Sequence, residues 1–221
     1  MGREIVQRFL DAGARVAIPI RPAGPAQVRL DEGTPSPGRP FEGACDVTSE
    51  GDVRAFVRAA REACGDPDIL VHAAGGYAGG TRVEETSLEV WENLHALNLR
   101  SAFLFARALL PGMLRRRQGR IVFVSAHTAL RPTARNGAYA VAKRGLLTLM
   151  EVMAEEVKGT GVTVNAVAPS VLRTEANSAA MPNADSNRWV PTADVATTIL
   201  FLCSPEAREI NGATLPLKGG M

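Results

Sequence analysis

Short runs of consecutive apolar residues alternate along this chain with longer segments in which apolar residues recur every three or four positions. A strand that is apolar throughout is buried on both faces, and strands of this kind separated by helices form a parallel sheet covered on both sides. The sequence therefore predicts a doubly wound α/β fold. The expected strands are 15–20, 41–47, 68–73, 120–125, 162–168 and 213–217, and the expected helices cover 5–10, 53–64, 87–114, 138–158 and 192–203.

Length and composition describe a globular protein with neither a nucleic-acid nor a membrane partner. The chain has 221 residues, of which 46% are hydrophobic and 22% charged, and a formal net charge of +2. These values favour one domain over residues 1–221. The basic run 115–117 follows an apolar helical stretch, where cations stabilise a helix C-terminus. No run reaches the roughly 18 apolar residues that span a bilayer, and residues 1–4 lead directly into an amphipathic helix.

Cysteine and histidine usage indicates neither a disulfide framework nor a metal centre. Cys45, Cys64 and Cys203 are widely spaced and lie in no Cys/His cluster. This pattern argues against a zinc site and fits a reducing, cytoplasmic compartment. The three histidines also stand apart in the sequence, and we expect them to be structural.

Tyr139 and Lys143 form the sharpest chemical feature, because they lie four positions apart at the start of an expected helix. Side chains at this spacing share one face of a helix. A nearby ammonium favours the phenolate and lowers a tyrosine pKa from its usual value of about 10. Tyr139 is therefore a candidate general acid or base. A Tyr/Lys pair at this spacing is common by chance, so the surrounding motifs decide its meaning.

Several further motifs follow one another in an order that resembles the short-chain dehydrogenase/reductase family, over essentially the whole chain. They are Asp46-Val47, His72-Ala73-Ala74-Gly75, Leu97-Asn98-Leu99, the Tyr139/Lys143 pair, Asn165 to Ser170 with Thr174, and the ending Gly212 to Gly220. The resemblance implies a single Rossmann-like domain that transfers hydride between a nicotinamide cofactor and a small-molecule substrate.

The resemblance also implies roles for the residues at the matching positions. Tyr139 would donate the proton, Lys143 would lower its pKa and hold the nicotinamide ribose, and Asn98 would support a proton relay. Asp46 would hydrogen-bond the adenine. The other expected cofactor contacts are Gly2, Arg21, Val47, Ala74, Gly75, Pro169, Leu172 and Thr174.

The N-terminus departs from the family pattern. Family members carry a strand and a Thr-Gly-x-x-x-Gly-x-Gly turn before the first helix, and only Gly2 matches the last glycine of that turn. The amide-lined turn that would cradle the pyrophosphate is then missing, and two parallel strands in the middle of the sheet would lack a partner. We expect a domain that lacks its first strand. A start upstream of Met1 or a truncated product would explain it, and we favour the upstream start.

The serine that most family members carry thirteen residues before the tyrosine is also missing. Counting back from Tyr139 reaches Ala126, with Ser125 beside it. Neighbouring residues on a strand face opposite sides of the sheet. Ser125 can therefore serve only where the end of the strand twists or bulges.

A glycine-dense stretch from Ala74 to Gly80, with Tyr77 in its middle, points to a subfamily. Together with the segment 181–185, the following Trp189 and the alanine at the serine position, it resembles dihydropteridine reductase. A quinonoid dihydropterin accepts hydride readily, so a second hydroxyl matters less for its reduction. Tyr77 and Trp189 are candidates for aromatic walls around a flat substrate; the alternative is that both residues only pack in a lid.

The end of the second strand bears on the choice of cofactor. NAD-specific relatives usually have an acidic residue there, whereas Ile20 is followed here by Arg21. An arginine can pair with a 2′-phosphate, so we expect NADP(H). NAD(H) is the alternative, because dihydropteridine reductase resembles the acidic type.

Three functions follow from these observations. The first is an NAD(P)H-dependent reductase of a pterin-like ring or small carbonyl, with Tyr139 and Lys143 as the proton-donor pair. The second is a 3-oxoacyl or other carbonyl reductase that uses Ser125, and the third is a non-catalytic binding or scaffold protein. Because family members commonly associate through the helices around Asn98 and Tyr139 and through the last strand, we expect a homodimer or homotetramer, with the run 102–110 serving as interface as well as core.

Overall fold

The computed structural model describes residues 1–22 and 39–220. Each helix and strand expected from the sequence is present within this part of the chain. The helices are α1 (Gly2–Asp11), α2 (Glu50–Cys64), α3 (Leu88–His95), α4 (Ser101–Arg116), α5 (His127–Leu130), α6 (Gly137–Glu156), α7 (Glu175–Ala180) and α8 (Thr192–Cys203). The strands are β1 (Ala17–Ile20), β2 (Phe41–Ala44), β3 (Ile69–His72), β4 (Gly119–Val124), β5 (Val162–Pro169), β6 (Leu172–Arg173), β7 (Val190–Pro191) and β8 (Thr214–Leu217).

All strand pairs are parallel, as the apolar strand pattern predicts. The main sheet has the order β3-β4-β5-β8, and β1 pairs separately with β2. The described residues contribute no strand that would join β1 to β3, which agrees with the expected sheet lacking its first strand. A short third ladder joins β6 to β7 beyond the end of β5.

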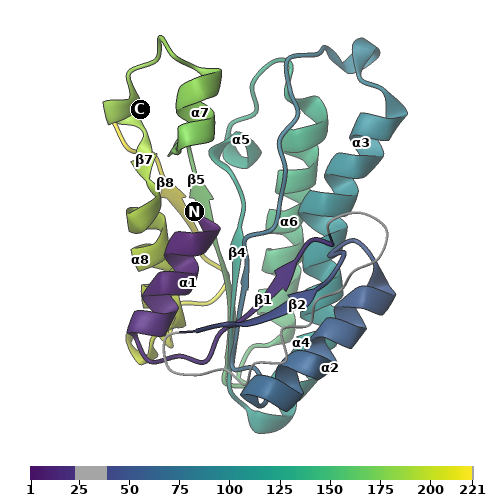
Figure 1. Ribbon diagram of the computed structural model, residues 1–221, viewed down its shortest axis with the longest axis vertical. Coiled ribbons are helices and arrows are strands. Elements are labelled where there is room, and N and C mark those ends of the chain that lie inside the picture. Colours follow the sequence, from purple (N-terminus) through teal and green to yellow (C-terminus); the bar gives the residue numbers. More distant parts are fainter. Residues whose placement is uncertain (23–38, 221) are drawn as a thin grey trace.

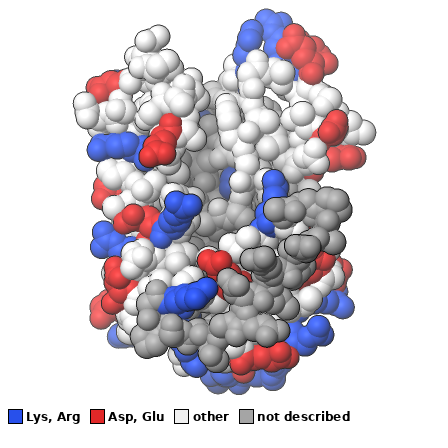
Figure 2. All heavy atoms as spheres, viewed as in Figure 1, with Lys and Arg blue, Asp and Glu red and all other residues white. Residues whose placement is uncertain are grey.

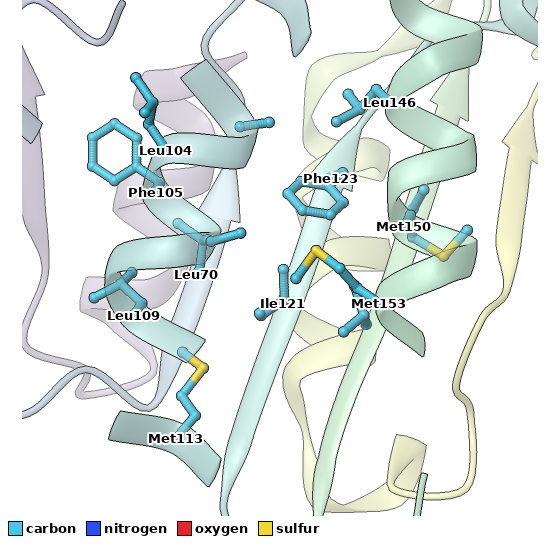
Figure 3. Close-up of a cluster of buried hydrophobic side chains, with 14 of the residues drawn as sticks. Leu70, Leu104, Phe105, Leu109, Met113, Ile121, Phe123, Leu146, Met150 and Met153 are labelled. Atoms are coloured by element: carbon cyan, nitrogen blue, oxygen red, sulfur yellow. The ribbon is translucent and has the colours of Figure 1, made fainter. Parts of the chain in front are cut away.

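Helices cover both faces of the main sheet, with α1 and α8 on one face and α4 and α6 on the other (Figure 1). Strand β4 shows why both faces are apolar. Ile121 and Phe123 lie in one hydrophobic cluster, together with residues of α4 and α6 (Figure 3), while Val122 and Val124 lie in a second cluster with α1 and α8. Helix α2 packs on β2 and α4, and Ser49 caps it by accepting a hydrogen bond from the Asp52 backbone.

The carboxyl ends of β3, β4 and β5 lead into the segments that carry the candidate site. They continue into the glycine-rich loop 73–82, helix α5, and the β6–α7 segment, respectively. Figure 2 shows a hollow near the carboxyl ends of these strands, between the part that carries α7 and the part that carries α3. In open α/β sheets, ligands bind at the carboxyl ends of the strands. Among the described helices, none combines the length and apolar character that crossing a bilayer requires.

Candidate active site

Helix α6 carries Tyr139 and Lys143 on one face, as their spacing predicts. The Lys143 ammonium nitrogen lies 6.0 Å from the centre of the Tyr139 ring. Lys143 is buried, and its Nζ donates a hydrogen bond of 2.9 Å to the carbonyl oxygen of Val124, the last residue of β4. The lysine thus ties the first turns of α6 to the carboxyl end of the central strand.

The pKa of Tyr139 differs from the sequence-based expectation. Burial, followed by the influence of Tyr77, raises the pKa of Tyr139 to about 12. Burial lowers the pKa of Lys143 to about 8. The net shift is therefore upward, opposite to the direction expected from the charge of Lys143 alone, because burial disfavours the phenolate. Tyr139 stays protonated near neutral pH, which is the state that a proton donor needs.

Tyr77 lies directly against Tyr139. The two rings meet edge to face, with their centroids 5.1 Å apart and their planes at 85°. The Tyr77 hydroxyl donates a hydrogen bond of 2.8 Å to Oδ1 of Asn136, the residue that precedes α6. The Tyr77 side chain is nonetheless 66% exposed. It therefore places an accessible phenol beside the candidate proton donor.

Asn98 holds the glycine-rich loop in place from a π-helical turn, Ala96–Arg100, between α3 and α4. Its Oδ1 accepts a hydrogen bond from the Gly76 backbone N–H, and its Nδ2 donates to the carbonyl oxygens of Gly76 and Leu94. Both amide hydrogens are thus engaged. Asn98 acts here as a positioning residue for the loop, and its part in a proton relay stays a prediction.

Gly75 lies between Asn98 and Lys143 with no room for a side chain. A Cβ at this position would lie 2.8 Å from Asn98 Oδ1 and 3.2 Å from Lys143 Nζ. The backbone of the loop therefore approaches the lysine as closely as it can. The preceding residue, Ala74, is half-buried.

Ser125 is hydrogen-bonded to the backbone of α6. Its buried hydroxyl donates a hydrogen bond of 3.0 Å to the carbonyl oxygen of Lys143 in α6. Among residues 1–22 and 39–220, this hydroxyl makes no hydrogen bond to Tyr139, and the catalytic role of Ser125 stays a prediction. Ala126 is buried at the N-terminal end of α5.

The expected contacts for the adenine half of the cofactor lie near the ends of β1 and β2. The Asp46 carboxylate accepts hydrogen bonds from the backbone N–H and the hydroxyl of Thr48, and these bonds lower its pKa, with Arg21 adding a smaller effect. Arg21 is exposed, and Val47 packs against the core. Gly2 begins α1, with open space around it and no side-chain cap.

The expected contacts for the nicotinamide half follow β5. Pro169 is buried and Leu172 half-buried, and Thr174 caps α7 by accepting a hydrogen bond from the Asn177 backbone. Trp189 is only 4% exposed. This burial favours the alternative that Trp189 only packs, and its role as an aromatic wall for a substrate stays a prediction.

Sequence reasoning missed two features of this region. One is Asn136, whose only signal is its place before an expected helix. The other is the pair formed by His72 and Ser101, in which His72 Nε2 lies 3.0 Å from the serine hydroxyl. Burial, then Lys143, lowers the pKa of His72 to about 3, so the histidine is a neutral core residue, as expected. No group of three or more metal-ligating side chains occurs in residues 1–22 and 39–220.

Comparison with known proteins agrees with the motifs and the fold. A family model described as enoyl-(acyl carrier protein) reductase matches residues 1–221. Curated relatives include 3-oxoacyl-(acyl-carrier-protein) reductase of Vibrio cholerae, 32% identical over 100% of this chain and 92% of the relative. D-threitol dehydrogenase of Mycolicibacterium smegmatis is 33% identical over 100% of this chain and 88% of the relative. The 7alpha-hydroxysteroid dehydrogenase of Escherichia coli K12 is 30% identical over 100% of this chain and 89% of the relative. The chain is therefore an oxidoreductase that belongs to the short-chain dehydrogenase/reductase family.

Proposed function

We propose that this enzyme is an NADP(H)-dependent carbonyl reductase, in which Tyr139 protonates the oxygen of a small ketone, of the 3-oxoacyl type or a related one. The observation that carries the proposal is the protonated phenol of Tyr139 beside the ammonium of Lys143. Both residues lie where β4 ends and α6 begins, next to loop segments that line the carboxyl ends of the strands.

The relatives support a ketone or alcohol substrate over a pterin ring. The three named above are, by name, a 3-oxoacyl reductase, a sugar-alcohol dehydrogenase and a hydroxysteroid dehydrogenase. The likeness to dihydropteridine reductase rests on the glycine-dense loop, the segment 181–185 with the following Trp189, and Ala126, and the burial of Trp189 weakens it. A carbonyl substrate is therefore the better-supported choice.

The residues around Lys143 fit a nicotinamide nucleotide. An ammonium group has three hydrogens, and among the described residues the only hydrogen bond of Lys143 Nζ is to Val124, so donors are left for ribose hydroxyls. The uncapped start of α1 at Gly2 offers backbone N–H groups to a phosphate. Arg21 would pair with the 2′-phosphate of NADPH, which is why we favour NADP(H). When bound, the cofactor supplies the hydride.

The protein's own part in the reaction is to deliver and stabilise a proton. As the carbonyl carbon gains hydride, the electron pair of the C=O π bond moves to oxygen, and this oxygen takes the phenol proton of Tyr139. The phenolate that remains is stabilised by the positive charge of Lys143. Asn98 and Gly75 fix the loop backbone next to this lysine.

A turnover assay tests the proposal. The purified chain is given NADPH or NADH with a 3-oxoacyl thioester, a cyclic ketone or a quinonoid dihydropterin, and nicotinamide oxidation is followed by absorbance. We expect turnover of at least one ketone, with NADPH preferred. Nucleotide binding without reduction of any ketone, or turnover of the dihydropterin alone, would contradict the proposal.

We also propose that the enzyme is a homodimer or homotetramer that associates through α3, α4 and α6. A groove of about 870 Å³ on this side is lined partly by Trp91, Leu99, Phe103 and Leu149. Phe103 is 44% exposed, whereas most of the apolar run 102–110 is buried in the monomer core. Light scattering on the wild type and on Phe103→Glu tests this: the variant is expected to dissociate, and a monomeric wild type would contradict the proposal.

A further inference from the structure

Two loops far apart in the sequence are tied together over the candidate active site. The Gly80 backbone N–H donates a hydrogen bond of 2.8 Å to the carbonyl oxygen of Arg135, and Arg135 Nη1 donates one of 3.3 Å to the carbonyl oxygen of Gly80. The bond from Tyr77 to Asn136 is the third connection between these loops. Tyr77 is thus held at a fixed place next to α6, although its ring is largely exposed.

The glycine at position 79 makes this arrangement possible. A Cβ added there would collide with the Tyr77 hydroxyl and with Oδ1 of Asn136. The loop backbone therefore wraps closely around the hydrogen-bonded pair. Any side chain at position 79 would force Tyr77 and Asn136 apart. The hydrogen bond between them therefore depends on the glycine at this position.

A second hydrogen-bond donor to the carbonyl oxygen accelerates the reduction of a ketone, because it stabilises the negative charge that develops on this oxygen in the transition state. Ala126 has no hydroxyl to offer, and the hydroxyl of Ser125 is turned toward the Lys143 carbonyl. The chain has two tyrosines, Tyr77 and Tyr139, and their rings are in contact, with centroids 5.1 Å apart. Tyr77 is therefore the hydroxyl-bearing ring that packs beside the candidate proton donor.

We propose that Tyr77 is a catalytic residue that donates the second hydrogen bond to the substrate carbonyl oxygen, in place of the hydroxyl that Ala126 lacks. The proposal rests on the proposed carbonyl reductase function. Tyr139 transfers its proton to the oxygen, whereas Tyr77 only donates a hydrogen bond and keeps its proton. The substrate oxygen would lie between the two phenols, which favours ketones whose carbonyl is accessible from both sides.

A chain of reversible hydrogen bonds allows Tyr77 to turn its proton toward the substrate. In the free protein, Tyr77 donates to Asn136 Oδ1, and Asn136 Nδ2 donates to the Thr133 hydroxyl at 2.7 Å. If the amide of Asn136 turns over, its Nδ2 donates to the Tyr77 oxygen and its Oδ1 accepts from Thr133. Each group then keeps its partner, and the phenol proton is released to the carbonyl.

The test compares ketone reduction by the wild type, Tyr77→Phe, and Tyr77→Phe with Ala126→Ser. Tyr77→Phe keeps the ring that packs on Tyr139 and removes only the hydroxyl. We expect kcat/KM for the ketone to fall about 10- to 100-fold, with most of the loss in kcat and with NADPH affinity unchanged in a fluorescence titration. Adding Ala126→Ser is expected to restore most of this loss, because it supplies a hydroxyl at the position that the family uses.

A control on the same loop separates this effect from general loosening. Thr81→Val removes an exposed hydroxyl whose one hydrogen bond within the described part of the chain is to Thr86, and it is expected to leave kcat/KM unchanged. If the wild type is active and Tyr77→Phe is equally active, the proposed role of Tyr77 is overturned. The same holds if adding Ala126→Ser does not restore the kcat/KM that Tyr77→Phe loses. A wild type that binds NADPH but reduces no ketone would instead overturn the proposed function.

Discussion

The ammonium nitrogen of Lys143 lies 6.0 Å from the centre of the Tyr139 ring, yet its hydrogen bond goes to the carbonyl oxygen of Val124. The lysine is therefore close enough to stabilise a phenolate once one forms, but in the free protein it does not hold the phenol ionised. This geometry separates the two roles of the pair. In the proposed reaction, Tyr139 keeps its proton until the substrate takes it, and Lys143 stabilises the negative charge that the transfer leaves on the phenolate.

The pH dependence of ketone reduction follows from these two groups. A proton donor with a pKa of about 12 stays protonated from pH 6 to 10, so the ionisation of Tyr139 does not change the rate in that range. Lys143 has its pKa near 8, so its charge is present at lower pH and is lost as the pH rises through about 8. We expect kcat/KM at subsaturating NADPH to be flat at low pH and to fall above about pH 8.

A variant at position 143 tests whether this fall in activity above pH 8 comes from Lys143. Lys143→Met removes the titrating ammonium, and its residual activity is expected to show no fall near pH 8. The same variant should be more stable at pH 7, by about 1–3 kcal/mol in chemical denaturation, because burying the charged lysine is unfavourable and the lost bond to Val124 offsets only part of the gain. If kcat/KM of Lys143→Met still falls near pH 8, the fall does not come from Lys143.

Acid should destabilise the fold through His72. Its pKa in the folded protein is about 3, whereas that of an unfolded histidine is about 6.5, so between these values the unfolded chain binds one more proton. The contribution of neutral His72 to the free energy of unfolding is therefore fully present above pH 6.5. It falls below that pH by about 1.4 kcal/mol per pH unit, which is a loss of about 2 kcal/mol by pH 5. Urea titrations of the wild type and His72→Asn from pH 7 to 5 should differ by this slope, and parallel curves would contradict it.

Gly75 should tolerate no side chain. Gly75→Ala places a Cβ 2.8 Å from Asn98 Oδ1 and 3.2 Å from Lys143 Nζ. We expect a loss of about 1–3 kcal/mol in stability and a weaker NADPH affinity, because the loop must move away from both residues. Gly51→Ala is the matched control: Gly51 lies in α2, where an added Cβ would meet only Ser49 Oγ at an ordinary contact distance of 3.9 Å, and alanine there should be neutral or slightly stabilising. Equal effects of the two substitutions would contradict the close fit at Gly75.

The sequence predicts the fold far better than it predicts the site. Helix α8 has the predicted bounds 192–203, because its apolar spacing is regular and Pro191 precedes it. Helices α5 and α7, with four and six residues, are too short to show a helical period, and the pattern does not predict them. Tyr77 and Asn136 are 59 positions apart in two loops, and no periodicity brings such residues together. The tyrosine pKa was misjudged because the sequence shows the neighbouring charge but not the depth of burial.

The central claim is that Tyr139 donates the proton in NADPH-dependent reduction of a ketone. The most direct test measures ketone turnover by the wild type and by Tyr139→Phe, together with NADPH affinity and the unfolding transition of each protein. The account predicts that the variant loses turnover by about 10²- to 10⁴-fold, while it binds NADPH and unfolds much like the wild type. A folded Tyr139→Phe variant that reduces the ketone at the wild-type rate would contradict the account.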